Sequence, residues 1–298
     1  MDVAYLGPQG TFTEAAALQL APGASLLPMG SPGEAVAAVS RGEAEYAVVA
    51  IENSVDGPVT STFDALVSSD DLQIYAEVDL DVVFSIFARA DSEPRTFATH
   101  PVAWQQVKGW VQSRWPDVRF LPASSNADAA HMVADGEADA CAAPARAGVI
   151  YGLIPVAEGV ADVAGARTRF VLVGRRGPCP ERTGNDRTSV AFTLPNEPGS
   201  LVRALNEFAV RGVDLSRIES RPTRSSFGTY RFYADLIGHI DDLPVAEALR
   251  GLYLRADQLH FLGSWPAVSG GSGDTGLVGS PRLAEADDYI RSLQAKER

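Results

Sequence analysis

An apolar segment that ends abruptly in a polar turn constrains the fold of this chain most. Residues 46–51 are apolar enough for a buried parallel strand, and they stop at residues 52–54, Glu-Asn-Ser. Gly57-Pro58 then turns the chain, and Thr60 or Ser61 offers an N-cap for a following helix. Ligands of open α/β sheets lie beyond the carboxyl ends of strands, so this turn is a candidate site, although an ordinary polar loop has the same composition.

The chain repeats this alternation of strand and helix to about residue 175. Strands are expected at 3–6, 46–51, 82–88, 95–98, 118–121, 138–143 and 169–174. Helices are expected to begin at or near Thr11, Ser31, Thr60, His100, Ser125 and Pro144. Two such blocks joined by two crossings predict an α/β domain of two lobes with a cleft between them. The polar helix starts would face that cleft, which suits a small polycarboxylate.

Charge and composition exclude several classes of partner. The chain has 298 residues, 46% of them hydrophobic, and a net charge of −13. It therefore predicts a globular protein of about two domains, without the basic face that nucleic acid or an anionic membrane requires. An anionic substrate would have to be held by a few local cations or helix ends.

Targeting and redox signals point to the cytoplasm. No apolar run approaches the ~18 residues of a membrane span, and the opening strand at 3–6 leads us to expect no signal peptide. That expectation argues against an extracellular solute-binding protein. The two cysteines, Cys141 and Cys179, lie in very different contexts, so we expect no disulfide and a reducing compartment.

A second folding unit follows a linker at 175–187 that is rich in Pro, Gly and charge. Its predicted order, βαββαβ, is ferredoxin-like, with elements at 189–194, 200–210, 213–220, 229–237, 243–254 and 258–263. Residues 269–276 predict a flexible linker, and the tail from Pro281 suits a short docking helix or a frayed end. We place the domains at 1–178 and 188–266, with linker and tail at 267–298.

Few side chains outside the turn carry recognisable chemistry. Arg169, beside Thr168 at a strand start, could grip a carboxylate bidentately, although it could equally be a surface arginine. His100 precedes Pro101 at a helix start and could be an acid, a base or a substrate donor, or only a capping residue. The histidines lack metal-ligand spacing, so no metal site is predicted. Cys141 fits a core position better than a nucleophile.

Short segments follow one another along the chain in a specific order. In the first domain they are YLGPQGTFTEA (5–15), IENS (51–54) with Gly57, His100-Pro101 with Gln106, Tyr151-Gly152-Leu153 and Thr168-Arg169-Phe170. In the second domain they are Gly199-Ser200-Leu201-Val202, which resembles a Gly-Ala-Leu-Val pattern, and Glu219-Ser220-Arg221-Pro222. Together they resemble the prephenate dehydratases that carry a C-terminal ACT regulatory domain. The similarity spans nearly the whole folded chain.

The resemblance implies a first domain like a type 2 periplasmic binding protein, followed by the ACT domain. It implies decarboxylating dehydration of prephenate to phenylpyruvate without a cofactor. As catalytic residues it implies Thr168 at the leaving hydroxyl and Arg169 at a carboxylate, together with Glu52. It implies a substrate cleft lined by Thr11, Asn53, Ser54, Thr99, His100, Gln106, Ser125 and Phe170.

The resemblance also implies feedback by phenylalanine on a homodimer or homotetramer assembled through the ACT and catalytic domains. The phenylalanine site would comprise Asn196, Pro198, Gly199, Ser200, Leu201, Val202, Glu219, Ser220, Arg221 and Pro222. The glycine at a helix start allows close approach of a small ligand, although both segments also fit simple turns. Ser200 in place of the usual alanine could tune effector affinity.

The source of the proton for the leaving hydroxyl stays open. A threonine is a poor general acid near neutral pH, and by residue chemistry Glu52 or His100 is better. The family often has an asparagine just before Thr-Arg-Phe, where this chain reads Ala164-Gly165-Ala166-Arg167, so turnover could be lower. Two alternatives are an arogenate dehydratase, whose substrate has an amine in place of the keto group, and a ligand sensor without turnover.

Overall fold

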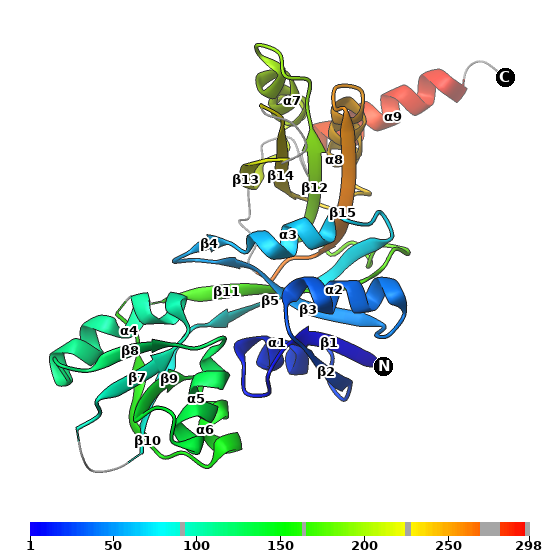
Figure 1. Cartoon of the computed structure of the whole chain (residues 1–298). Coiled ribbons are helices and arrows are strands. Elements are labelled where there is room, and N and C mark those ends of the chain that lie inside the picture. Colours follow the sequence, from blue (N-terminus) through cyan, green and yellow to red (C-terminus); the bar gives the residue numbers. More distant parts are fainter. Residues whose placement is uncertain (90–92, 163–164, 224–227, 269–280, 296–298) are drawn as a thin grey trace. The chain divides into compact units, whose positions relative to one another are not determined.

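The computed structural model describes residues 1–89, 93–162, 165–223, 228–268 and 281–295. It divides into two compact units (Figure 1). One comprises Met1–Leu72 and Ala76–Arg176, and the other comprises Gln73–Tyr75 and Gly177–Arg298.

The first lobe of the first unit has the strand order β5-β11-β3-β1-β2. β3 and β2 pair with β1 in parallel, whereas β11 runs antiparallel to β3. Its elements are β1 (Asp2–Leu6), α1 (Phe12–Leu20), β2 (Ser25–Met29), α2 (Pro32–Arg41), β3 (Tyr46–Asn53), β4 (Gly57–Pro58), α3 (Thr60–Leu66), β5 (Leu72–Asp81) and β11 (Arg167–Arg175). Val3, Tyr5 and Val48 of the sheet pack against Ala16 and Ala17 of α1 in one buried cluster.

The second lobe has the strand order β10-β6-β9-β7-β8. Its elements are β6 (Phe84–Ala88), β7 (Thr96–Thr99), α4 (Pro101–Arg114), β8 (Arg119–Pro122), α5 (Asn126–Asp135), β9 (Ala140–Ala143), α6 (Ala145–Tyr151) and β10 (Pro155–Val160). Consecutive strand residues point to opposite faces, so Phe97 packs in the cluster of α4, and Ala98 packs in that of α5 and α6. Helices thus cover both faces of the sheet.

The chain enters the second lobe between β5 and β6 and returns between β10 and β11. The α/β fold with two lobes and two crossings is therefore confirmed. The segment 82–88, predicted as one central strand, begins pairing only at Phe84 and lies between β10 and β9.

Helix starts in this unit follow the capping pattern at most positions. Thr11 accepts a hydrogen bond from the Glu14 N–H, Ser31 from that of Glu34, and Ser125 from that of Asp128. The cap predicted at Thr60 or Ser61 is wrong. Val59 is the N-cap residue of α3 and makes no side-chain capping bond, because the helix already includes Thr60.

The strands that were not predicted include β2 and β10. Both are edge strands with mixed burial, and each contains a proline, Pro28 or Pro155. Edge positions tolerate proline and need no continuous apolar run, so the hydrophobic pattern there is weak.

The second unit has the strand order β13-β14-β12-β15, with antiparallel pairs throughout. Its elements are β12 (Asp186–Thr193), α7 (Ser200–Ala209), β13 (Leu215–Pro222), β14 (Tyr230–Ile237), α8 (Leu243–Tyr253), β15 (Gln258–Pro266) and α9 (Pro281–Ala295). The predicted βαββαβ order is confirmed, and the tail from Pro281 is helical. The linker predicted at 269–276 lies outside the described residues.

None of the helices in the described part of the chain combines the length and apolarity that a membrane crossing requires. The same residues contain no group of three or more His, Cys, Asp or Glu side chains that could hold a metal ion.

Candidate active site

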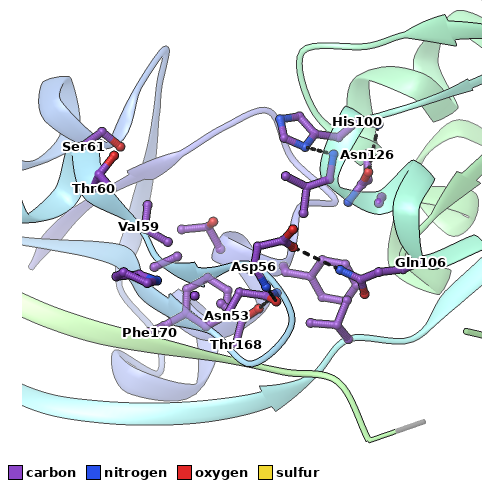
Figure 2. A pocket seen from close by; sticks show the side chains of 18 of the residues that line it. Asn53, Asp56, Val59, Thr60, Ser61, His100, Gln106, Asn126, Thr168 and Phe170 are labelled. Carbon is purple, nitrogen blue, oxygen red and sulfur yellow. Dashed lines mark hydrogen bonds between the residues drawn. The ribbon is translucent and has the colours of Figure 1, made fainter. Parts of the chain in front are cut away.

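A cavity of about 380 Å³ lies between the two lobes of the first unit (Figure 2). One wall comes from the start of α1, from β3 and the turn after it, and from β11. The other wall comes from β6 and from the starts of α4 and α5. Of the site residues predicted from the sequence, the cavity is lined by Asn53, His100, Gln106, Thr168 and Phe170.

The β3–β11 pair decides which predicted residues face this cavity. Thr168 is paired with Asn53, and Arg169 with Glu52. Because neighbouring strand residues point to opposite faces, Thr168 and Asn53 face the cavity while Arg169 and Glu52 point away. A β-bulge follows, in which Phe170 pairs with Ala50, and both of these residues line the cavity.

The hydroxyl of Thr168 is held as a hydrogen-bond donor. Asn53 Nδ2 donates to Thr168 Oγ1 over 2.9 Å, and Thr168 is only 8% exposed. Among the described residues, no acceptor is hydrogen-bonded to the hydroxyl proton of Thr168. That proton is therefore available to a molecule bound in the cavity.

Arg169 lies in a cluster of carboxylates on the other face of the strands. Its Nη1 is 3.4 Å from Glu52 Oε2, and its Nε is 3.2 Å from Asp79 Oδ1 and 3.8 Å from Glu77 Oε2. Neither Arg169 nor Glu52 lines the cavity. In this arrangement neither side chain reaches the cavity, so the catalytic roles predicted for the two residues stay predictions.

His100 and Gln106 of the second lobe face Asp56 across the cavity (Figure 2). His100 Nδ1 accepts a hydrogen bond from the Val102 N–H over 3.3 Å, which leaves Nε2 to carry the proton of a neutral ring. Burial lowers the pKa of His100, and the charge of Asp56 opposes that shift. Gln106 is 1% exposed, and its Oε1 has no hydrogen-bond partner among the described residues. Both side chains can therefore bind a ligand.

Two predicted residues, Thr11 and Ser125, line a smaller neighbouring cavity of about 160 Å³, which His100 also lines. Thr11 Oγ1 accepts from the Glu14 N–H over 3.2 Å and donates to the Leu6 carbonyl over 3.1 Å. These hydroxyls hold the helix ends that face the cleft.

Ser54 and Thr99 line neither cavity. Ser54 ties the turn to β11, because its N–H donates to the Arg167 carbonyl and its Oγ accepts from the Arg167 N–H. Thr99 is fully buried, with Oγ1 3.1 Å from Asn126 Oδ1. Both residues shape the walls of the cavity from behind.

Several other lining residues were not among the predicted site residues, including Phe12, Thr13, Phe84, Asp56 and Asn126. Asn126 Oδ1 accepts from the His100 N–H over 3.2 Å and so joins the starts of α4 and α5. Phe12, Thr13 and Asn126 each lie in the first turn of a helix whose N-terminus faces the cleft. Including the two residues that follow each predicted N-cap among the site candidates would have found them.

The cavity suits an anion although no lysine or arginine is among its described lining residues. Amides, hydroxyls and the N-termini of α4 and α5 supply the positive ends of dipoles instead. A larger cavity of about 520 Å³ elsewhere in the unit is lined by the three carboxylates of Asp2, Glu43 and Glu45 and by Arg175, and the excess of negative charge argues against an anionic ligand.

The residues predicted to bind phenylalanine lie at one end of the second unit's sheet. Thr193 and Arg221 both pair with Arg231, so the loop after β12 and the end of β13 lie at the same end of the sheet. Gly199 is the N-cap of α7 with φ +80°, a conformation that favours glycine. Leu201 is 36% exposed.

Comparison with known proteins agrees with both units. A family model described as prephenate dehydratase matches residues 3–178, and an ACT domain model matches residues 188–252. A prephenate dehydratase of Corynebacterium glutamicum is 55% identical over 300 residues, which cover 97% of this chain and 95% of that protein.

Two solved structures are similar over most of their length. Arthrobacter aurescens prephenate dehydratase in complex with L-Phe has a TM-score of 0.89 at 38% identity, covering 99% of this chain and 100% of that one. GqqA, described as a novel type of quorum quenching acylase, has a TM-score of 0.80 at 32% identity, covering 90% of this chain and 98% of that one. The family match over more than half of the chain and the 55% identity to a curated member lead to one assignment. The chain belongs to the prephenate dehydratase family of hydro-lyases and carries an ACT domain.

Proposed function

We propose that this enzyme converts prephenate to phenylpyruvate, carbon dioxide and water, and that phenylalanine regulates it through the ACT domain. The hydrogen bond from Asn53 to Thr168 inside the interlobe cavity carries the proposal, because it leaves the threonine hydroxyl free to donate to a leaving group. The product is aromatic, so the reaction runs strongly downhill. The enzyme has to orient the substrate, polarise its hydroxyl and exclude water.

The substrate is a dicarboxylate with a ring hydroxyl. Amide and ring N–H groups of Gln106, Asn126 and His100 would bind its carboxylates at the dipole ends of α4 and α5. Phe12 and Phe84, which meet edge to face at 5.7 Å, would pack against its ring. Phe170 lines the cavity on the same wall as Phe12 and would extend this apolar contact.

Thr168 would donate its hydroxyl proton as a hydrogen bond to the leaving oxygen. The bond between the ring and its carboxylate breaks, its electron pair enters the ring, and the carbon–oxygen bond breaks as the hydroxyl leaves and takes up one proton to become water. The bonding pattern of Thr168 supports this role, because accepting from Asn53 directs the hydroxyl proton away from the amide.

Arg169 and Glu52 would act by positioning. Arg169 joins Glu52 of β3 to Asp79 of β5, and this contact fixes the strand pair that presents Thr168 and Asn53. Ser54 and Thr99 would support the walls in the same way.

The test is phenylpyruvate formation by the purified protein, with prephenate and arogenate compared as substrates. Turnover of prephenate, lost on replacing Thr168 with alanine, is the expected result. Turnover of arogenate but not of prephenate would mean that arogenate is the substrate. Binding of phenylalanine without turnover of either compound would favour the sensor alternative.

Regulation would act on a dimer or tetramer. The two predicted segments lie at one end of the ACT sheet, and a relative's structure contains L-Phe, which together support a phenylalanine site there. Sedimentation and turnover, each measured with and without phenylalanine, test the assembly and the sign of regulation. No change in either quantity would contradict the proposal.

A further inference from the structure

Asp56 is the one carboxylate among the described residues that line the interlobe cavity. Beside a bound dianion an ionised carboxylate weakens binding, because like charges repel across a short distance. Such a residue is out of place in a site that only binds the substrate. In its protonated form, however, it offers an acid.

The backbone of Asp56 is fixed by the residue that holds Thr168. Asn53 Oδ1 accepts from the Val55 N–H over 2.8 Å and from the Asp56 N–H over 3.1 Å. Asn53 Nδ2 donates to Thr168 Oγ1 over 2.9 Å. One amide side chain therefore sets the positions of both the threonine hydroxyl and the aspartate.

Gln106 approaches Asp56 from the other lobe. Gln106 Nε2 is 3.5 Å from Asp56 Oδ2, and Figure 2 shows Asp56 between the Asn53–Thr168 pair and Gln106. Asp56 itself is exposed, so water can return a proton to it after each turnover.

We propose that Asp56 is the general acid that protonates the leaving hydroxyl of the substrate; this rests on the function proposed above. The Asp56 carboxyl gives its proton to the ring hydroxyl, which leaves as water. The electron pair of the bond to the departing CO2 enters the ring as the carbon–oxygen bond breaks. The dianion and one proton thus give the phenylpyruvate monoanion, CO2 and water, and Asp56 regains its proton from solvent.

The other candidate acids are less well placed. Glu52 points away from the cavity and is paired with Arg169. Burial lowers the pKa of His100, which favours its neutral ring, a weak acid. Thr168 can polarise the oxygen, but a hydroxyl is a poor proton source near neutral pH.

A bound dicarboxylate itself would favour the protonated form of Asp56, because a second ionised carboxylate in one site is disfavoured. His100 is the other titratable group among the described lining residues, and Asn53 and Gln106 beside Asp56 are neutral. The proton that Asp56 donates would therefore be taken up when the substrate binds.

The test compares Asp56→Asn, Asp56→Glu and, as a matched control, Asp117→Asn at an exposed aspartate between α4 and β8. General acids contribute roughly 100- to 10,000-fold, so Asp56→Asn should lower kcat at least ~100-fold. Its KM should stay constant or fall, because a negative charge beside the dianion is lost. Asp56→Glu should recover part of kcat, and the control should match the unchanged protein.

The pH profile provides a second measurement. The dependence of kcat on pH should differ between the unchanged protein and Asp56→Asn, because only the unchanged protein has this acid. Circular dichroism confirms that the variants fold. A wild-type kcat in Asp56→Asn, or an unaltered pH profile, overturns the proposal while leaving the function intact. Absence of phenylpyruvate from the unchanged protein would overturn both.

Discussion

Asn53 and Thr168, 115 residues apart in the chain, are joined by a 2.9 Å hydrogen bond from the amide nitrogen to the hydroxyl oxygen. The register of β3 and β11 places the two residues opposite each other. Since an amide nitrogen can only donate, the hydroxyl must accept here and keeps its own proton for another partner. The pair thus converts a common side chain into an oriented donor.

Replacing Thr168 with valine should remove that donor while preserving shape. We expect kcat to fall about 100- to 1,000-fold, the range seen when one preorganised donor is removed, with little change in thermal unfolding. Thr168→Ser, which keeps the hydroxyl, is the control and should retain most of the turnover. A valine variant with normal kcat would exclude Thr168 from the reaction.

Replacing Asn53 with aspartate tests the direction of the same hydrogen bond. An aspartate can still accept from the N–H groups of Val55 and Asp56, but it would accept the proton of Thr168 instead of donating to its oxygen. We expect a kcat loss similar to that of Thr168→Val. The double variant should lose little more than either single one, because the two side chains act as a unit. Independent, additive losses would refute the pairing.

The position of the cavity could be predicted because it depends on local patterns. The apolar run at 46–51, the polar turn after it and the capping residues Thr11 and Ser125 each act over a few residues, and the sequence contains them directly. The side that a strand residue faces depends on pairing as well. Arg169 points away because of the register with β3, which no local pattern reveals.

Asp56 was overlooked for a similar reason. In the sequence it is one polar residue of a turn before Gly57. It gains significance only because Gln106, from the other lobe, lies 3.5 Å away. The edge strands β2 and β10 were missed since edges lack a continuous apolar pattern.

Arg169→Gln distinguishes positioning from direct substrate contact. Arg169 is 17% exposed and lies among the carboxylates of Glu52, Glu77 and Asp79, so its loss should lower the free energy of unfolding by about 1–3 kcal/mol. We expect KM for prephenate to change little, whereas kcat falls as the strand pair loosens. Urea unfolding and steady-state kinetics measure these effects. A large rise in KM at unchanged stability would instead support the carboxylate contact predicted from the sequence.

Glu14 and Arg146 join α1 of the first lobe to α6 of the second. Arg146 Nε donates to Glu14 Oε2 over 2.7 Å, and the Gly10 N–H donates to the same oxygen over 2.8 Å. Burial alone would raise the pKa of Glu14, but these hydrogen bonds outweigh it and hold the pKa below its ordinary value. The stability they contribute is therefore present above the unfolded pKa, about 4.3, and is lost as the pH falls through the folded value.

Glu14→Gln should accordingly lower the free energy of unfolding at pH 7 by roughly 1–3 kcal/mol. The difference from the unchanged protein should shrink as the pH falls below about 4 and vanish below the folded pKa, where the carboxylate is protonated in both states. Chemical unfolding at several pH values measures it. A difference that stays constant with pH would rule out the ionised pair as its source.

Gly199→Ala tests the phenylalanine site without touching the catalytic unit. Gly199 has φ +80°, and a Cβ there would lie 3.2 Å from Arg203 Nη1, so alanine both strains the backbone and narrows the approach to the start of α7. We expect turnover without phenylalanine to be normal. The phenylalanine concentration that gives a half-maximal response should rise at least tenfold. Gly184→Ala is the matched control, since Gly184 has φ +88° with no atom within 4 Å of the added Cβ. Calorimetry and inhibition curves compare the two variants. If Gly199→Ala binds and responds as the unchanged protein does, the ligand lies elsewhere, whereas equal weakening in both variants would mean that backbone strain in the second unit is responsible.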